Sequence, residues 1–227
     1  KMKSEAIVEL GKPLQTIETE TPTPKGKEVL LKITHSGVCH SDVHIHDGYF
    51  DLGGGNKLPV GAMLNLPHTM GHEIEGEVVG IGPDVNDIEI GSNVVAYPWI
   101  GCGDCSTCSD GDEHYCNAPR QLGIQLPGGF ADYCIVPDSK YVLDYEGIRP
   151  GLAATYMCSG LTAFGALKKI VNISDNDHIL IMGLGGVGMM GLQFARSLFN
   201  CKILAADIDP NKLQAAKGAG ADEVYDT

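Results

Sequence analysis

Residues 178–210 read HILIMGLGGVGMMGLQFARSLFNCKILAADIDP. An apolar run at 178–182 is followed by a glycine-rich turn and then by apolar residues at helical spacing. A second apolar run at 202–206 leads to Asp209 and Pro210, which are typical of a helix N-cap and of the first helical position. Strand, turn, helix and strand in this order predict a parallel, doubly wound α/β sheet.

The glycine-rich turn of this stretch fits G-x-G-x-x-G, a pattern that is weak alone. Here it follows a strand and opens a helix, and Asp207 ends the next strand. Such glycines permit a tight turn and a close approach to a pyrophosphate, while the carboxylate binds the ribose hydroxyls. Because Asp207 would repel a 2′-phosphate, we predict NAD rather than NADP; the alternative is a turn that binds nothing. The predicted NAD-binding residues are Gly183, Gly185, Gly186, Val187, Gly188 and Asp207.

The regions on either side of this stretch complete a half-sheet. Residues 151–170, GLAATYMCSGLTAFGALKKI, have helical spacing, and ADEVYD at 221–226 begins a third strand. We therefore expect residues 151–227 to form the first half of a Rossmann domain. Since an open sheet edge is a liability, we also expect the chain to be part of a longer protein.

The first 150 residues have a different character. VLLKITHSG at 29–37 and several later segments are short and β-branched, with Gly and Pro at the turns between them. This pattern predicts an all-β, barrel-like domain over residues 1–150. The Gly-rich segment 51–59, DLGGGNKLP, is expected to be a surface loop.

Residues 97–116, YPWIGCGDCSTCSDGDEHYC, carry four cysteines in a C-x2-C-x2-C-x7-C pattern. Four thiolates this close together can wrap one tetrahedral Zn²⁺ and leave no open coordination position. A pair of disulfides is the alternative, but two-residue spacings strain such bridges. We therefore predict a structural zinc site formed by Cys102, Cys105, Cys108 and Cys116.

Composition excludes several classes of function. The net charge is −13 and only 16 residues are basic, which argues against nucleic acid or an anionic membrane as a partner. The chain contains neither an apolar run long enough to span a bilayer nor a signal-peptide core. Eight cysteines without a secretory signal indicate a reducing, cytoplasmic location.

A catalytic zinc site would need three protein ligands and one open position. Cys134 and Cys201 lie in strand patterns, where core packing is the better explanation. Cys39, His72, Cys158 and the other histidines remain as candidates, although a single cysteine such as Cys39 is more often packing than ligand. Spacing alone does not select this trio.

Taken together, the motifs resemble the zinc-dependent medium-chain dehydrogenases of the alcohol dehydrogenase family. The resemblance rests on GVCHSDVH (37–44), GHE (71–73), the cysteine loop, CSGLTAFGAL (158–167) and GLGGVG (183–188) followed by Asp207. It runs from near the start to the end of the chain. It implies a GroES-like barrel followed by a Rossmann cofactor domain.

The resemblance also implies roles for individual residues. Cys39, His72 and Cys158 would bind the catalytic zinc, with Glu73 behind the metal and Asp42 orienting His72. Ser41 would receive the alcohol proton and His44 would pass it to solvent, while His40 would contact the pyrophosphate. Trp99 and either Tyr49 or Phe50 would line the substrate pocket; Trp99 could equally be core, and His46 is expected at the surface.

The resulting expectation is an NAD-dependent alcohol dehydrogenase that binds two zinc ions and acts on a small alcohol, aldehyde or ketone. A homodimer or homotetramer is implied for the full-length protein. A polyol or sugar dehydrogenase is the nearest alternative. Those relatives often use a carboxylate as the third zinc ligand, so a cysteine at position 158 disfavours this alternative. Nothing in segment 51–59 supports a glutathione-linked formaldehyde dehydrogenase. A non-catalytic NAD- or zinc-binding relative is the alternative from another class.

Overall fold

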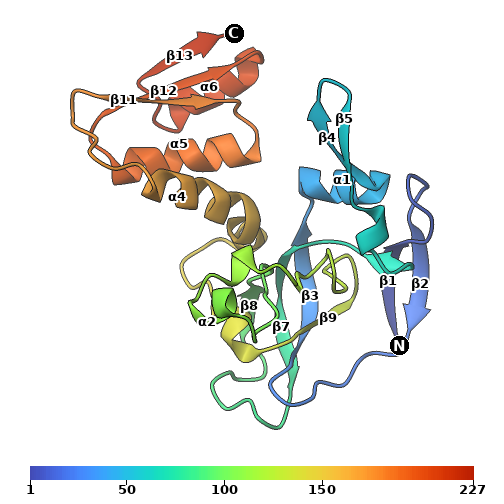
Figure 1. The fold of residues 1–227 in the computed structure, drawn as a ribbon. Helices are drawn as coiled ribbons and strands as arrows, with labels where there is room; N and C mark the ends of the chain where they lie inside the picture. Colours follow the sequence, from blue (N-terminus) through green and yellow to red (C-terminus); the bar gives the residue numbers. More distant parts are fainter. The chain divides into compact units, whose positions relative to one another are not determined.

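The computed structural model describes residues 1–227 and divides into two compact units, Lys1–Met157 and Cys158–Thr227. The first unit is mostly β-structure and the second alternates strands with helices (Figure 1). No helix is both long enough and apolar enough to cross a membrane. The predicted fold class, a GroES-like barrel followed by half of a Rossmann domain, is confirmed.

Two sheets and a hairpin build the first unit. The larger sheet has the strand order β10-β8-β7-β3-β9, and the smaller has the order β2-β1-β6. All neighbouring strands in these sheets are antiparallel. The strands are β1 (Met2–Ile7), β2 (Gln15–Thr19), β3 (Val29–Gly37), β6 (His68–Thr69), β7 (Glu73–Ile81), β8 (Asn93–Ala96), β9 (Tyr133–Val136) and β10 (Val142–Asp144).

Strand β7 shows how the sequence sorts its side chains. Ile74 and Val78 are fully buried in the apolar core of the unit, where they pack with Val29 and Leu31 of β3. The glutamates of β7 occupy the alternate positions and therefore face the other side of the sheet, because side chains alternate along a strand. The first two glutamates are nevertheless buried.

Helix α1 (His40–Asp47) follows β3 and was not indicated by the apolar pattern, because its hydrophobic stripe is short. Gly48 ends the helix in the left-handed conformation, with φ of 82°. The expected loop 51–59 forms most of a hairpin, β4 (Tyr49–Gly53) and β5 (Asn56–Pro59). Its turn residues Gly54 and Gly55 have positive φ, as a tight hairpin turn requires. Lys57 on β5 lies 3.6 Å from the ring centroid of Tyr49.

Short helical segments complete the first unit and lead out of it. Gly61–Met63 (η1), Glu113–Tyr115 (η2) and Ser139–Tyr141 (η3) are single turns, and α2 (Ser106–Ser109) lies in the cysteine loop. Helix α3 (Ala153–Thr155) packs on β7 and β3. A π-helical turn, η4 (Tyr156–Gly160), continues from it across the boundary between the units.

The second unit contains a parallel sheet with the order β11-β12-β13. Helix α5 packs against β11 and β12, and α6 packs against β12 and β13 (Figure 1). The predicted helix at 151–170 is interrupted by η4 and continues as α4. The elements are α4 (Leu161–Lys168), β11 (His178–Met182), α5 (Gly186–Leu198), β12 (Lys202–Asp207), α6 (Pro210–Gly218) and β13 (Glu223–Asp226).

Candidate metal centres and nucleotide-binding turn

Four sulfur atoms converge in the loop between β8 and β9. The Sγ atoms of Cys102, Cys105, Cys108 and Cys116 all lie within 4.8 Å of one another. Three of the pairs are 3.9, 3.5 and 3.8 Å apart. Zn–S bonds of ~2.3 Å in a tetrahedron require sulfur atoms about 3.8 Å apart, whereas a disulfide requires ~2.05 Å. The four sulfurs therefore fit one zinc ion, and the disulfide alternative is wrong because all are free thiols.

Backbone N–H groups of the loop point at these sulfur atoms. The Sγ of Cys116 accepts hydrogen bonds of 3.4 Å from the N–H of Cys102 and 3.3 Å from that of Ala118. Hydrogen bonds from the backbone N–H groups of Asp104 and Cys105 lower the pKa of Cys102 to about 6. These donors favour the thiolate, which is the form that binds a metal.

The cysteine loop is also held to the barrel without any metal. The carboxylate of Glu113 accepts hydrogen bonds from the Tyr141 hydroxyl, from Lys140 Nζ at 2.6 Å and from the Gly101 N–H at 3.3 Å. Gly101 has no room for a larger side chain, since a Cβ there would lie 2.5 Å from Cys108 Sγ. The loop therefore packs closely around its sulfur atoms.

A second pair of predicted ligands meets at the start of α1. Asp42 accepts a hydrogen bond of 2.9 Å from the N–H of Cys39 and one of 3.3 Å from the N–H of Gly71. The same carboxylate lies 3.2 Å from Nδ1 of His72. The ligand atoms of Cys39 and His72 lie within 4.8 Å of each other. One carboxylate thus joins the two segments that carry these residues.

His72 is fully buried, and neither of its ring nitrogens has an aligned hydrogen-bond partner in the chain. Burial lowers the pKa of the imidazole, but Asp42 and Cys39 together raise it to about 9. Buried polar atoms without partners are uncommon in folded proteins. An imidazole nitrogen in this state, beside a thiol and backed by a carboxylate, is the environment that a zinc ion would complete. The residues present fit that ion.

Two glycines make room for the residues beside His72. Glu73 is buried, and a Cβ on Gly37 would lie 2.0 Å from its Oε2. Gly71 has φ of 93°, and a Cβ there would lie 2.6 Å from the ring of Phe130. Larger residues at either position would displace the histidine loop or the strand beside it.

The residues predicted to move a proton lie on α1. Ser41 and His44 are three residues apart, so they are neighbours on one surface of the helix. The ring of His44 lies 4.7 Å from that of His40 and 4.8 Å from that of Phe50. His46 lies apart from this group, and its ring nitrogens contact a neighbouring carboxylate and a backbone carbonyl.

Trp99 connects the barrel to the segment that precedes Cys158. Its Nε1–H donates a hydrogen bond of 2.9 Å to the carbonyl oxygen of Met157, and its ring centroid lies 5.8 Å from that of His72. Cys158 follows Met157 directly in the chain and is buried within η4.

The glycine-rich turn of the second unit has the expected local geometry. Gly183 has φ of 82°, and a Cβ on Gly188 would lie 1.8 Å from the carbonyl oxygen of Gly183. Gly185 caps α5, with open space around the positions of both Gly185 and Gly186. The carboxylate of Asp207 lies beside this turn. The motif therefore presents backbone N–H groups at the start of a helix next to a carboxylate.

Glu75 is a residue that the sequence pattern did not indicate. It lies on β7 and is 1% exposed, and its carboxylate contacts His35, Tyr145 and Gly151. The only available signal was the alternation of glutamates with apolar residues along this strand. Alternation of this kind ordinarily indicates a solvent-facing side.

A family model described as the alcohol dehydrogenase GroES-like domain matches residues 25–146, more than half of the chain. The chain belongs to this family. An NAD-dependent alcohol dehydrogenase of Saccharolobus solfataricus is 39% identical over 224 residues. That alignment covers 98% of this chain and 63% of the relative.

Solved structures of similar proteins agree with membership of the alcohol dehydrogenase family. A cobalt- and zinc-bound thermostable alcohol dehydrogenase from Pyrobaculum aerophilum matches with a TM-score of 0.84 and 30% identity, over 98% of this chain and 65% of that one. The acetophenone reductase of Geotrichum candidum, solved in complex with NAD, matches with a TM-score of 0.85 and 30% identity. The match covers 100% of this chain and 63% of the reductase. The chain thus spans somewhat less than two thirds of the length of these relatives.

Proposed function

We propose that the protein is a zinc-dependent oxidoreductase that transfers hydride between an alcohol and NAD, reversibly giving an aldehyde or ketone. The observation that carries this proposal is the buried His72 with an unpartnered ring nitrogen beside the Cys39 thiol. Family membership and the similarity to NAD-dependent alcohol dehydrogenases support it.

In this proposal Cys39, His72 and Cys158 hold the catalytic zinc, and the four-cysteine loop holds a structural zinc. Two thiolates and an imidazole are a ligand set that suits Zn²⁺ and leaves one position open. The bound ion would supply Lewis-acid polarisation of the substrate oxygen. Asp42 would fix the orientation of the His72 ring through its contact with Nδ1. Glu73 would lie behind the site.

The proton would be handled by residues of α1. Ser41 would accept it from the alcohol hydroxyl, and His44 would pass it to solvent. The two residues are three positions apart and lie on one surface of the helix. Trp99, whose ring lies near that of His72, would form part of the substrate pocket together with Tyr49 or Phe50.

The cofactor would bind the second part of the chain. We propose that residues 1–150 form the catalytic domain and residues 151–227 the first half of the NAD-binding domain. The glycines at 183, 185, 186 and 188, with Val187, would approach the pyrophosphate, and Asp207 would bind the adenosine ribose. His40 would contact the pyrophosphate. NAD would accept the hydride.

Three further features belong to the same proposal. The substrate is a small molecule, as in the alcohol dehydrogenase family. The active protein would be a homodimer or homotetramer. Its site of action would be the cytoplasm, because a chain with eight cysteines, several of them predicted metal ligands, suits a reducing compartment.

The test is formation of reduced cofactor from NAD over a panel of primary, secondary, aromatic and polyhydroxy alcohols, with zinc content measured in the same samples. We expect activity on simple alcohols and a fall in kcat of at least about 100-fold in His72→Ala, since loss of an outer partner alone costs 10–100-fold. Cys201→Ala, which alters a buried thiol in the core of the second unit, is the control.

The possible results separate the alternatives. Turnover restricted to polyhydroxy substrates would replace the proposal with a polyol or sugar dehydrogenase. Absence of turnover on the whole panel, with both zinc sites filled, would make the protein a non-catalytic relative.

A further inference from the structure

We propose that Glu75 is a positioning residue for the catalytic zinc site: its buried carboxylate fastens the segment Tyr145–Gly151, which leads to the ligand Cys158. This inference rests on the proposed function, because it assumes that Cys158 binds the ion. It assigns a role to a residue that lies outside the predicted ligand and relay set.

Hydrogen bonds occupy both oxygens of the Glu75 carboxylate. Glu75 Oε1 lies 3.0 Å from Nδ1 of His35 and accepts a hydrogen bond of 3.1 Å from the Tyr145 hydroxyl. The N–H of Gly151 donates to both oxygens, at 3.1 and 3.0 Å. Glu75 therefore binds the connecting segment at both of its ends.

Burial of the Glu75 carboxylate is costly without these partners. Glu75 is 1% exposed, and a carboxylate without partners would be strongly disfavoured there. Removing the acid would leave the Gly151 N–H without its acceptor. An unsatisfied buried donor costs more free energy than one hydrogen bond contributes on balance. Gly151 has φ of 80°, and a Cβ there would lie 3.2 Å from the His35 ring. The segment therefore has one close-fitting arrangement over Glu75.

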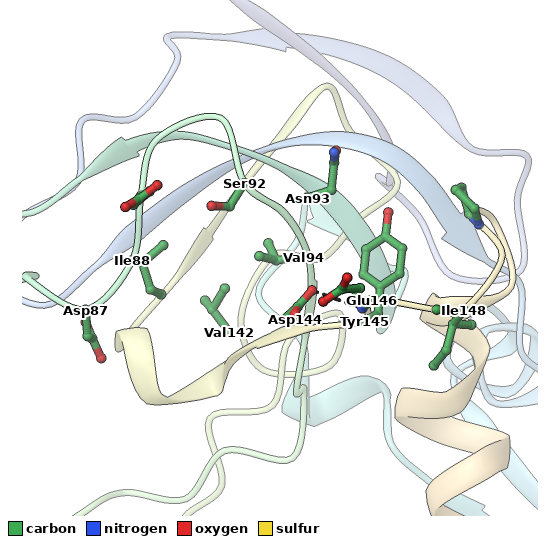
Figure 2. A pocket seen from close by; sticks show the side chains of 13 residues that line it. Asp87, Ile88, Ser92, Asn93, Val94, Val142, Asp144, Tyr145, Glu146 and Ile148 are labelled. Atoms are coloured by element: carbon green, nitrogen blue, oxygen red, sulfur yellow. Dashed lines mark hydrogen bonds between the residues drawn. The ribbon is translucent and has the colours of Figure 1, made fainter.

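The same segment also borders space that side chains leave unfilled. A cavity of about 790 Å³ lies there, lined by Val94, Val142, Tyr145, Ile148 and several acidic side chains (Figure 2). On the face that borders this space, the segment therefore gains little from packing. The hydrogen bonds from Tyr145 and Gly151 to Glu75 tie the segment to β7 beside this space.

Further contacts hold the chain between Gly151 and Cys158. Ala153 and Ala154 of α3 are each 1% exposed and pack over the sheet that carries Glu75. Trp99 then holds the carbonyl of Met157, one residue before Cys158. Glu75 at the start and Trp99 at the end thus fix the seven-residue path to the third ligand.

The experiment measures retention of zinc by the protein under challenge with a chelator, with native mass spectrometry counting the ions. We expect the wild-type protein to hold two ions. In Glu75→Ala, the ion of the Cys39 site should dissociate at least about tenfold faster, within the range seen when supporting groups of metal sites are removed. The ion of the four-cysteine loop should be unaffected. Glu75→Gln, which keeps an acceptor oxygen, should restore part of the retention.

Glu77→Ala provides the matched control, because Glu77 lies on the same face of β7 but is only partly buried. It should behave like the wild type. In a cobalt-substituted sample, the absorption from the Cys39 site should change in Glu75→Ala and not in Glu77→Ala.

Each contrary result overturns the proposal in a recognisable way. Wild-type retention at both sites in Glu75→Ala would refute the positioning role and leave the proposed function intact. Equal acceleration at both sites would show that Glu75 only stabilises the fold. A wild-type protein that holds zinc only in the cysteine loop would refute the catalytic site itself.

Discussion

The carboxylate of Asp207 accepts a hydrogen bond of 2.6 Å from the backbone N–H of Leu184, inside the glycine-rich turn. A second bond of 2.9 Å comes from the N–H of Asp209. These backbone donors hold the pKa of Asp207 below its ordinary value, with a smaller contribution from the ammonium group of Lys212. The acid at the end of β12 thus holds the turn in place and carries a fixed negative charge beside it.

This charge predicts the choice between nicotinamide cofactors. Asp207→Ser should weaken NAD binding and reduce the repulsion of a 2′-phosphate. Because like charges placed together cost several kcal/mol, the ratio of Kd values for NADP and NAD should fall by at least about tenfold. Titration of each cofactor by fluorescence measures both constants. Asp209→Asn, which keeps a helix N-cap, should leave the ratio unchanged, and an unchanged ratio in Asp207→Ser would contradict this assignment.

Loss of one sulfur from the cysteine loop should release one ion. Cys102→Ser should lower zinc content by one per chain and reduce the free energy of unfolding by more than about 4 kcal/mol, a size typical of a lost metal. Urea denaturation combined with metal analysis measures both quantities. The control Cys201→Ala changes a buried thiol in the core of the second unit that belongs to no predicted ligand set, and it should retain all zinc. If the zinc content of Cys102→Ser matched the wild type, a four-sulfur site would be untenable.

Glu113 should stabilise the same loop through charge. Burial raises the pKa of this carboxyl, but Lys140, Tyr141 and the Gly101 N–H lower it below the usual 4.5. Glu113→Gln should therefore lower the free energy of unfolding by about 1–2 kcal/mol at neutral pH. The effect is no larger because Lys140 is half exposed and solvent screens its charge.

The pH dependence of that difference has a definite sign. Above the ordinary pKa, folded and unfolded chains both carry the ionised Glu113, so its full stabilising effect is present. As the pH falls from 4.5 through the lower folded pKa, the effect is lost. The difference in unfolding free energy between the wild type and Glu113→Gln should shrink over that range. A difference that stayed constant would show that the charge of Glu113 has no role.

His68 should make stability depend on pH in a higher range. Burial lowers the pKa of this imidazole below 6.5, against the opposing effect of a 3.1 Å hydrogen bond to the Gly123 carbonyl. The neutral ring is therefore required in the folded state, and its stabilising effect is complete above pH 6.5 and lost as pH falls through the folded value. Each unit by which folding lowers the pKa contributes about 1.4 kcal/mol to the pH dependence of the unfolding free energy.

The measurement compares the wild type with His68→Gln, whose amide can also donate to Gly123. Unfolding free energies at about pH 8 and about pH 5 bracket the titration of a histidine. The wild type should lose more stability on acidification than the variant does. Equal losses of unfolding free energy in the wild type and the variant would mean that His68 has the same pKa in the folded and unfolded chains.

The four-cysteine site could be predicted from sequence because its ligands lie within one short loop, where spacing limits geometry. The turn at Gly183–Gly188 could be predicted for the same reason. Cys39 and His72 are 33 residues apart, and residue types alone favoured packing for Cys39. Their pairing depends on Asp42, which binds both segments, and only resemblance to the family indicated it in advance.

Glu75 illustrates what local patterns cannot supply. Its partners His35, Tyr145 and Gly151 are 40, 70 and 76 residues away. A strand with alternating glutamates looks solvent-facing until the tertiary fold covers it. The hairpin at Tyr49–Pro59 was missed for a different reason: glycines at its turn resemble a loop, although their positive φ values are what a tight hairpin needs.

The alternation along β7 also protects the strand from misalignment. A slip of one position against β3 would turn Glu73 and Glu75 toward the barrel interior and expel Ile74 and Val78 from it. No compensating partner for two inward acids exists in that apolar interior. Misregistered pairings of β7 with β3 are therefore disfavoured during folding. The single favoured register in turn fixes the position of His72, which immediately precedes the strand.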